Sequence, residues 1–478
     1  MKFTLYRAYN EESPYQRSLP PLGIGYLISY LKKNNPDVEP IFCSRAEDIL
    51  ATKPDIIGIS SATENFPHAI EVAKKIKEKS KVPIIIGGMH ITSLPHKLPD
   101  CFDIAVLGEG ELTLSELMGV FKTDNLIFKK DSLEKIKGIC FHDNDKVIVN
   151  PMRELMPNLD VLPYPDREAT GDNWILSPRD EVHLVTSRGC PYDCSFCAAS
   201  KLWQKYRYFS VEYVVAEVEY LMNKYQPEEV YFFDDLFIGN LKRFREICGE
   251  FKKRNFHKKT VFKSYARVDL VNDELCSLFK DLNFKYIDLG IEANNETALT
   301  FLNKRNVTPE INQRAMDCLA KYGISIGVNI IIGSCPETAE DIEKTYQFVL
   351  KNKDIIDRIS FGPLLPIPGT KVWDYALEKG IISEDLDWSR LSYDMDNFDI
   401  EKYPLMSEKL SKDELYEFYK KFRSISREIT RDGYLKYLDH KANVRKYRII
   451  ELENELKTLK GSRLIRAAEK LRNIYRES

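Results

Sequence analysis

The chain has 478 residues, of which 43% are hydrophobic and 30% charged, with a formal net charge of −3. This length allows two or three domains with a large core, and the near-neutral charge excludes a general attraction to nucleic acid or to a membrane. The first fifteen residues lack the apolar core of a signal peptide, so we expect a cytoplasmic protein. Ten scattered cysteines favour reduced thiols or metal ligation over a disulfide scaffold.

Residues 1–130 predict a doubly wound, Rossmann-like α/β domain. Apolar runs that read as buried parallel strands alternate with stretches of helical periodicity. The expected strands are 2–8, 56–62, 82–88 and 104–109, and the expected helices are 22–33 and 68–80. Ligands of such sheets bind at the carboxyl ends of the strands, which is where this segment keeps its small residues.

Residues 131–182 form a predicted connection between two domains. A hairpin turning at residues 143–145 is expected first, followed by an extended, proline-rich linker at residues 156–168.

The βα alternation returns over residues 183–395 with larger spacing. Six strands are expected, at 183–187, 229–235, 260–267, 286–293, 324–333 and 357–366. Six βα units fall short of the eight of a closed TIM barrel, so we expect a partial (β/α)6 barrel.

Residues 396–478 are expected to be helical, with an N-cap pattern at Ser411. Apolar residues at a/d spacing between Ile449 and Tyr475 predict a short self-packing hairpin. The last forty residues are rich in Lys and Arg, which is typical of a solvated helix face. Peripheral contact with an anionic membrane surface is the alternative.

Three cysteines lie close together directly after the first barrel strand, at Cys190, Cys194 and Cys197. Three thiolates are one ligand short of a closed tetrahedral site. A zinc site completed from a distant residue and a coincidental grouping remain alternatives. A [4Fe–4S] cluster held by three thiolates would leave one iron open to a small molecule.

The C-x3-C-x2-C spacing after a barrel strand resembles the signature of the radical S-adenosylmethionine (radical SAM) enzymes. The resemblance implies that SAM chelates the open iron and is cleaved to methionine and a 5′-deoxyadenosyl radical. It also implies SAM contacts near the ends of successive strands, although each residue taken alone also fits a salt bridge or a helix cap. The implied SAM contacts are Phe196, Asp234, Asp235, Ser264, Arg267, Glu292 and Arg305.

The segment "IIGSCPETAEDIEKT" resembles the fifth-strand segment of the same family but lacks the glycine that usually follows the proline. Cys335 stands just before that proline, near the expected barrel mouth. A packing role and a reactive thiol are both open for it.

The N-terminal half resembles the cobalamin-binding domain that is fused to one large radical SAM subfamily. The matching stretches are 20–31, 54–63, 83–90 and 103–113. The D-x-H-x-x-G motif, whose histidine binds cobalt in the best-known cobalamin domains, does not occur, and neither His68 nor His90 has that context. The implied cobalamin contacts are Leu22, Gly23, Ser60, Ser61, Thr63, Gly87, Gly88, Gly108, Glu109 and Gly110.

The combined resemblance implies a cobalamin-dependent radical SAM methyltransferase that acts on an unactivated carbon. Cyclisation, rearrangement or carbon–carbon coupling without methyl transfer is the alternative, and an Fe–S regulatory or scaffold protein is an alternative of another class. We expect a small-molecule or glycan- or lipid-linked substrate and an electron donor such as flavodoxin or ferredoxin. No nucleic-acid partner is expected.

Overall fold

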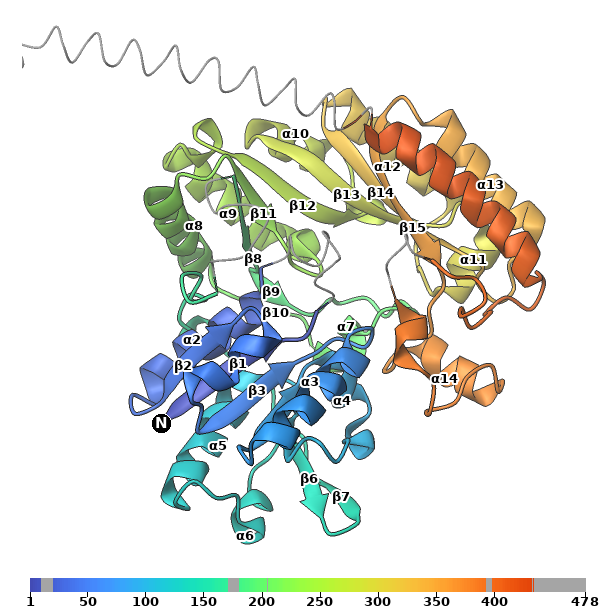
Figure 1. The fold of residues 1–478 in the computed structure, drawn as a ribbon. Coiled ribbons are helices and arrows are strands. Elements are labelled where there is room, and N and C mark those ends of the chain that lie inside the picture. Colours follow the sequence, from blue (N-terminus) through green and yellow to red (C-terminus); the bar gives the residue numbers. More distant parts are fainter. Residues whose placement is uncertain (10–19, 171–179, 204, 393–397, 432, 434–478) are drawn as a thin grey trace, which may run out of the picture.

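The structure is a computed structural model that describes residues 1–9, 20–170, 180–203, 205–392, 398–431 and 433. Two β-sheets follow one another along the chain and lie one above the other in Figure 1, the N-terminal sheet below and the larger curved sheet above. The predicted architecture of a Rossmann-like domain followed by a partial barrel is confirmed.

The first sheet has seven strands in the order β2-β1-β3-β4-β5-β6-β7. The strands from β2 to β5 pair in parallel, whereas β6 and β7 add antiparallel. Their bounds are β1 Lys2–Arg7, β2 Glu39–Cys43, β3 Ile56–Ser60, β4 Ile84–Gly87, β5 Ile104–Val106, β6 Ile139–Asp143 and β7 Lys146–Val149. The expected hairpin is present, and it extends the sheet of the N-terminal domain.

Helices cover both faces of this sheet, and alternating strand residues explain why. Ile84 and Ile86 point to one face and Ile85 to the other, because side chains alternate along a strand. One core contains residues of α3 (Phe66–Lys79) and α4 (Met89–Ser93). The other contains residues of α2 (Leu22–Asn34) and α5 (Gly110–Thr123).

The second sheet has six parallel strands in the order β15-β14-β13-β12-β11-β8. All six expected strands are present, and the two edge strands do not pair with each other, so the barrel is open. The bounds are β8 Glu181–Leu184, β11 Glu229–Phe232, β12 Val261–Arg267, β13 Phe284–Glu292, β14 Ser325–Ile332 and β15 Ile356–Pro363.

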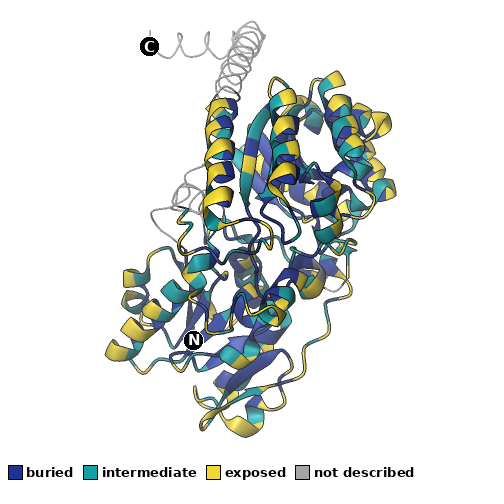
Figure 2. Ribbon diagram, turned by 90° about the vertical axis from the view of Figure 1, so that its right-hand side faces the viewer, coloured by how far each residue is buried: buried dark blue, intermediate teal, exposed yellow. Residues whose placement is uncertain are grey.

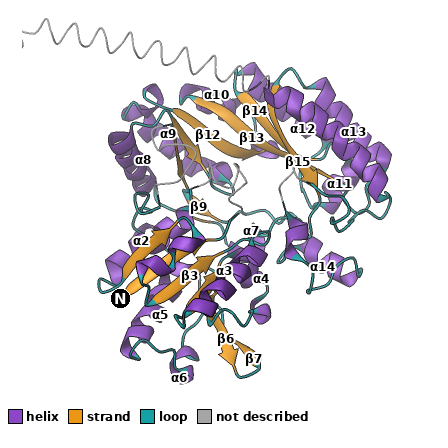
Figure 3. Ribbon diagram, viewed as in Figure 1, coloured by secondary structure: helices purple, strands orange, loops and turns teal. Residues whose placement is uncertain are grey.

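Amphipathic helices form the outer layer of the barrel, and Figure 2 shows their exposed residues turned away from the buried strands. They are α8 Val211–Tyr225, α9 Leu241–Lys253, α10 Asp273–Asp281, α11 Glu296–Phe301, α12 Pro309–Lys321 and α13 Ala339–Lys351. Short elements lie between the two sheets in Figure 3: α7 (Ala199–Trp203) and the two-stranded ribbon of β9 (Ser187–Arg188) and β10 (Arg207–Tyr208).

A final helix covers residues 412–431. It starts with the expected capping box, in which the Glu414 amide donates to Ser411 Oγ (3.3 Å) and the Ser411 amide donates to Glu414 Oε2 (2.8 Å). The predicted apolar seam from Ile449 to Tyr475 and the basic C-terminal helices lie outside the described residues. In the part of the chain that is described, no helix is both long and apolar enough to cross a bilayer.

Candidate active site between the two sheets

A cavity of about 770 Å³ lies between the N-terminal sheet and the mouth of the barrel. One wall comes from the carboxyl ends of β3, β4 and β5 and from α2. The opposite wall comes from the segments that follow β8, β11 and β15 and from the end of β14. The parallel strands of both sheets therefore turn their carboxyl ends, where ligands of such sheets bind, toward the same space.

The cysteine loop spans residues 189–206 between β9 and β10. It begins at Gly189, whose φ of +88° suits glycine, and a Cβ there would lie 2.8 Å from the Lys205 carbonyl oxygen. Ser195 anchors the middle of the loop: its amide donates to the Leu302 carbonyl (3.0 Å), and its carbonyl accepts from the Val372 amide (3.1 Å). The loop is thus held on both sides by the barrel.

The three cysteines of this loop fit an iron–sulfur cluster. Cys197 lines the cavity, and all three thiols are half-buried. Burial raises the pKa of Cys190 and raises that of Cys197 to about 12, and a bound metal would replace the thiol protons. Among the described residues, no group of three or more His, Cys, Asp or Glu side chains is arranged around a single ion. The three thiolates of a [4Fe–4S] cluster each bind a different iron, so they need not converge on one ion.

Two adjacent aspartates after β11 have different surroundings. Asp235 faces the cavity, accepts a hydrogen bond from the Gly189 amide (3.2 Å), and has a pKa raised by burial within the cavity walls. Asp234 lies behind the cavity wall and accepts hydrogen bonds from the amide (2.9 Å) and hydroxyl (2.8 Å) of Thr186. Asp234 does not line the cavity, because its carboxylate is buried and turned toward β9, and its expected contact with SAM stays a prediction.

Of the two residues expected at the end of β12, Arg267 contacts the cysteine loop. Arg267 Nε lies 2.8 Å from Asp269 Oδ1, and Arg267 Nη1 lies 3.5 Å from Cys194 Sγ. Its guanidinium also stacks 3.9 Å from the centre of the Tyr192 ring. Ser264 is buried, and its hydroxyl donates to the Tyr265 carbonyl (3.1 Å), while the expected SAM contact at Ser264 stays a prediction.

Glu292 ends β13 with an unusual backbone, at φ +62°. Its Oε1 lies 2.9 Å from Nζ of Lys304, and both side chains are almost completely buried. Arg305 is exposed, and its Nε donates to Asn303 Oδ1 (3.0 Å). Lys304 was missed from sequence, although its position between two expected site residues was a usable signal.

Most of the expected cobalamin contacts line the cavity. They are Leu22, Gly23, Ser60, Gly87, Gly88, Gly108, Glu109 and Gly110. The glycines leave this wall without bulky side chains, as the approach of a flat macrocycle requires. Ser61 and Thr63 do not line it: Ser61 packs beneath Gly88, and the Thr63 hydroxyl lies 3.4 Å from His90 Nδ1.

No histidine lines the cavity among the residues that the structure describes. His90 is buried against Phe66, with ring centres 3.9 Å apart, and burial lowers its pKa to about 3. His68 Nε2 is 2.9 Å from the Tyr6 hydroxyl. Neither histidine therefore lies on the wall that carries the expected cobalamin contacts.

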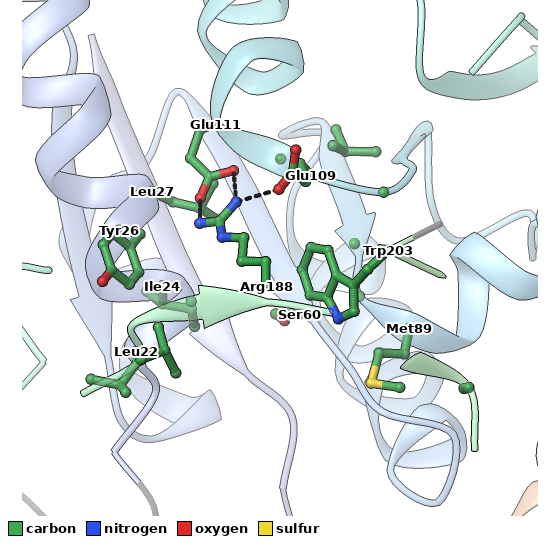
Figure 4. Close-up of a pocket in the computed structure, with 18 of the residues that line it drawn as sticks. Leu22, Ile24, Tyr26, Leu27, Ser60, Met89, Glu109, Glu111, Arg188 and Trp203 are labelled. Carbon is green, nitrogen blue, oxygen red and sulfur yellow. Dashed lines mark hydrogen bonds and ion pairs between the residues drawn. The ribbon is translucent and has the colours of Figure 1, made fainter. Parts of the chain in front are cut away.

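A buried ion-pair group closes one end of the cavity (Figure 4). Arg188 lies with Nη1 2.7 Å from Glu109 Oε1 and Nη2 2.5 Å from Glu111 Oε1. Its guanidinium is within 6 Å of the Tyr26 and Trp203 rings, at 5.6 and 5.7 Å from their centres. The sequence reading took Glu109 as a cobalamin contact and missed Arg188. Glu109 lines the cavity, but its carboxylate is held by Arg188 and Arg207, and its expected contact with cobalamin stays a prediction.

Cys335 is 1% exposed and lies away from the cavity lining. Burial raises its pKa to about 12, so a nucleophilic thiolate is disfavoured. Of the two alternatives for Cys335, its burial favours the packing role, and the reactive thiol stays a prediction that is not tested.

The fold and the site define a class of enzyme in which a cobalamin-type sheet faces a radical-generating partial barrel. Residues 184–349 match the radical SAM superfamily, and residues 14–118 match the B12 binding domain. The chain is 32% identical to an uncharacterized methyltransferase of Pyrococcus horikoshii, PH0819, over 76% of this chain and 80% of that protein. It belongs to the family of radical SAM enzymes that carry a B12-binding domain. It is a cobalamin-dependent enzyme whose cofactors are a [4Fe–4S] cluster, SAM and cobalamin.

Other relatives and solved structures share this organisation. The chain is 28% identical to an anaerobic magnesium-protoporphyrin IX monomethyl ester cyclase of Cereibacter sphaeroides, over 69% of this chain and 56% of that protein. The fold matches the methyltransferase TsrM of Kitasatospora setae with cobalamin and cluster bound (TM-score 0.64, 17% identity, 79% of this chain, 75% of that chain). It also matches the cobalamin-dependent radical enzyme OxsB with aqua-cobalamin bound (TM-score 0.62, 22% identity, 79% and 55%).

Proposed function

We propose that this enzyme transfers a methyl group from SAM, by way of cobalamin, to an unactivated carbon of its substrate. The observation that carries the proposal is the single cavity shared by the two domains, with Cys197 on one wall and Gly87 on the other. When bound, the cluster with SAM supplies a 5′-deoxyadenosyl radical, and cobalamin carries the methyl group. A substrate between the two walls would be within reach of both.

The chain's own residues would bind and orient these groups. Cys190, Cys194 and Cys197 would each ligate one iron. Asp235 is proposed to accept a hydrogen bond from the SAM ammonium, since its carboxylate faces the cavity beside the cysteine loop. Phe196, which also lines the cavity, would pack on the adenine. Glu292 and Arg305 are proposed for the ribose and the carboxylate of SAM.

The walls of the cavity favour a largely apolar substrate region. Its charged lining residues are Arg188, Glu109, Glu111 and Asp235, and the first three neutralise one another in part. Relatives include a hopanoid C-3 methylase of Methylococcus capsulatus, 25% identical over 74% of this chain and 68% of that protein. A small-molecule or a lipid- or glycan-linked substrate is proposed on these grounds. An electron donor of the flavodoxin or ferredoxin kind and a cytoplasmic location are part of the same proposal.

The test is anaerobic reconstitution with iron, sulfide and cobalamin, followed by incubation with a low-potential reductant such as dithionite, trideuteromethyl-SAM and an extract of the host's small molecules and lipids. Methyl transfer predicts 5′-deoxyadenosine together with a product that carries the deuterated methyl group. The cyclase relatives make ring formation the second candidate, and it predicts 5′-deoxyadenosine with an unlabelled, dehydrogenated product. An intact cluster that never cleaves SAM would contradict both.

A further inference from the structure

Two arginines stand opposite each other at the base of the cysteine loop. Arg188 ends β9, Arg207 begins β10, and the two residues are partners in the antiparallel ladder of these strands. The loop of residues 189–206, which carries all three cluster cysteines, leaves and re-enters the barrel domain through this ribbon. The ribbon therefore fixes where the loop starts and ends.

Both arginines reach across to one carboxylate of the N-terminal domain. Glu109 Oε1 lies 2.7 Å from Arg188 Nη1 and 2.9 Å from Arg207 Nη2, and Glu109 Oε2 accepts from Arg207 Nη1 at 3.0 Å. Glu111 adds a second carboxylate, 2.5 Å from Arg188 Nη2. None of these four side chains is more than 10% exposed, so two positive and two negative charges neutralise one another out of water.

The linker is held in the same place. The Met156 amide donates to Glu109 Oε2 (3.0 Å), and its carbonyl accepts from Arg207 Nη1 (2.7 Å). Burial alone would raise the pKa of Glu109. The hydrogen bonds from Arg207, Arg188 and the Met156 amide, together with the positive charge of Arg188, outweigh burial and lower this pKa. Three segments that are distant in sequence thus meet at one carboxylate.

The Glu109 side chain binds the two arginines and does not cap the helix that begins beside it. It stands at the N-cap of α5, where an acidic side chain usually accepts from the helix amides, yet it makes no side-chain cap bond. On the other side, the chain runs from Arg188 through Gly189 to Cys190. A Cβ at Gly189 would lie 2.8 Å from the Lys205 carbonyl and 2.9 Å from the Trp203 Cβ, so this short connection has little freedom to move.

We infer that Arg188, Arg207, Glu109 and Glu111 form a clamp that positions the cysteine loop against the cobalamin-binding domain. The spacing of the two cofactors is then set by the polypeptide before either cofactor binds. Arg188 and Arg207 are positioning residues, because they act on the cluster through the loop. The consequence for methyl transfer rests on the proposed function, whereas the clamp itself does not.

The clamp is tested first in the cofactor-free full chain by hydrogen–deuterium exchange. Glu109→Gln and Glu111→Gln keep the side-chain shape and remove the charge. Glu154→Gln is the matched control, because Glu154 pairs with Lys137 at an exposed site of the N-terminal domain. The clamp predicts at least tenfold faster exchange in residues 189–206 of both variants, with unchanged exchange in β3, β4 and α8. Unchanged exchange in the loop, or faster exchange throughout α5 and its sheet, would overturn it.

The second measurement uses the reconstituted holoenzyme. If the clamp sets the cofactor spacing, Glu111→Gln retains the cluster absorbance and SAM cleavage but forms several-fold less product per 5′-deoxyadenosine. Arg188→Lys, which keeps one charge, should recover part of this coupling relative to Arg188→Gln. If a variant showed faster loop exchange but formed as much product per 5′-deoxyadenosine as the wild type, the clamp would not control the spacing of the cofactors. Wild-type enzyme that transfers no methyl group would count against the proposed function and leave the exchange result standing.

Discussion

Lys304 donates from its ammonium to the Gly290 carbonyl at 3.0 Å, and the same Nζ lies 2.9 Å from the carboxylate of Glu292. Glu292 has φ +62°, a conformation that costs a non-glycine residue free energy. The buried ion pair therefore holds a strained residue at the mouth of the barrel, where the carboxylate is proposed to meet the ribose of SAM.

Lys304→Met leaves Glu292 buried without a partner, which is expected to lower the free energy of unfolding by about 3–5 kcal/mol. SAM affinity should fall at least tenfold, because the carboxylate loses its fixed orientation. Thermal unfolding and equilibrium dialysis with SAM measure the two effects. In the double variant with Glu292→Gln, we expect most of the stability to return while SAM affinity stays low. Lys321→Met is the control, since Lys321 pairs with Asp273 at an exposed site where about 1 kcal/mol or less is expected.

Single alanine substitutions at Cys190, Cys194 or Cys197 should remove the iron–sulfur absorbance and abolish 5′-deoxyadenosine formation, because two thiolates cannot retain the cluster. Cys335→Ala is the matched control at a buried thiol outside the loop. Iron content, absorbance at the cluster band and 5′-deoxyadenosine yield are the measurements. If Cys335→Ala lost activity while keeping its iron, the packing role assigned to Cys335 would be wrong.

The sequence predicted the strands of both sheets well, because buried parallel strands are written as continuous apolar runs. Strand β2 was not predicted, because its sequence "EPIFC" contains Glu39 and Pro40 and is not a continuous apolar run. Both residues are acceptable there because β2 is an edge strand of the sheet. The hairpin was recognised from its turn, yet its place in the N-terminal sheet depends on pairing between β5 and β6, which no local pattern encodes.

The position of the cavity could be predicted from the sequence, but the surroundings of single residues could not. Motif spacing predicted Cys197 and Asp235, which line the cavity, but it could not tell Asp235 from its neighbour Asp234, since one peptide step turns the side chain from the cavity to the interior. Arg188 and Arg207 look like ordinary strand residues. Their role depends on Glu109, which lies 79 and 98 positions away in the chain.

Gly88→Ala should weaken both the fold and cobalamin binding. Gly88 has φ +112°, and a Cβ there would lie 2.3 Å from the Ser61 carbonyl oxygen, so β3 and β4 must separate to accept it. A loss of about 1–3 kcal/mol in unfolding free energy is expected from strain of this kind. Gly119→Ala is the control, because no atom lies within 4 Å of its added Cβ and a helix gains roughly 0.5–1 kcal/mol from the change. Chemical denaturation and an absorbance titration with cobalamin measure the outcome, and equal cobalamin affinity in the two variants would contradict the assignment of this wall.

The last prediction concerns pH and a carboxyl group on the buried face of α8. Glu217 Oε1 is 3.0 Å from Arg167 Nη2, yet burial outweighs that charge and raises the pKa of Glu217 from 4.5 to about 7. The folded protein therefore binds a proton that the unfolded chain releases between these two values. This contribution to stability is fully present below pH 4.5 and is lost as the pH rises through 7. At about 1.4 kcal/mol for each pKa unit, the loss is about 3 kcal/mol.

Glu217→Gln mimics the protonated form at every pH, so denaturation of this variant between pH 5 and 8 should show a smaller decline than the wild type. Asp234, whose pKa burial raises to about 6, titrates with the same sign and keeps part of the slope in the variant. The control is Glu219→Gln, at an exposed position of the same helix, and it should follow the wild-type curve. Parallel curves for the wild type and Glu217→Gln would mean that Glu217 stays ionised in the folded protein and that the Arg167 charge prevails over burial.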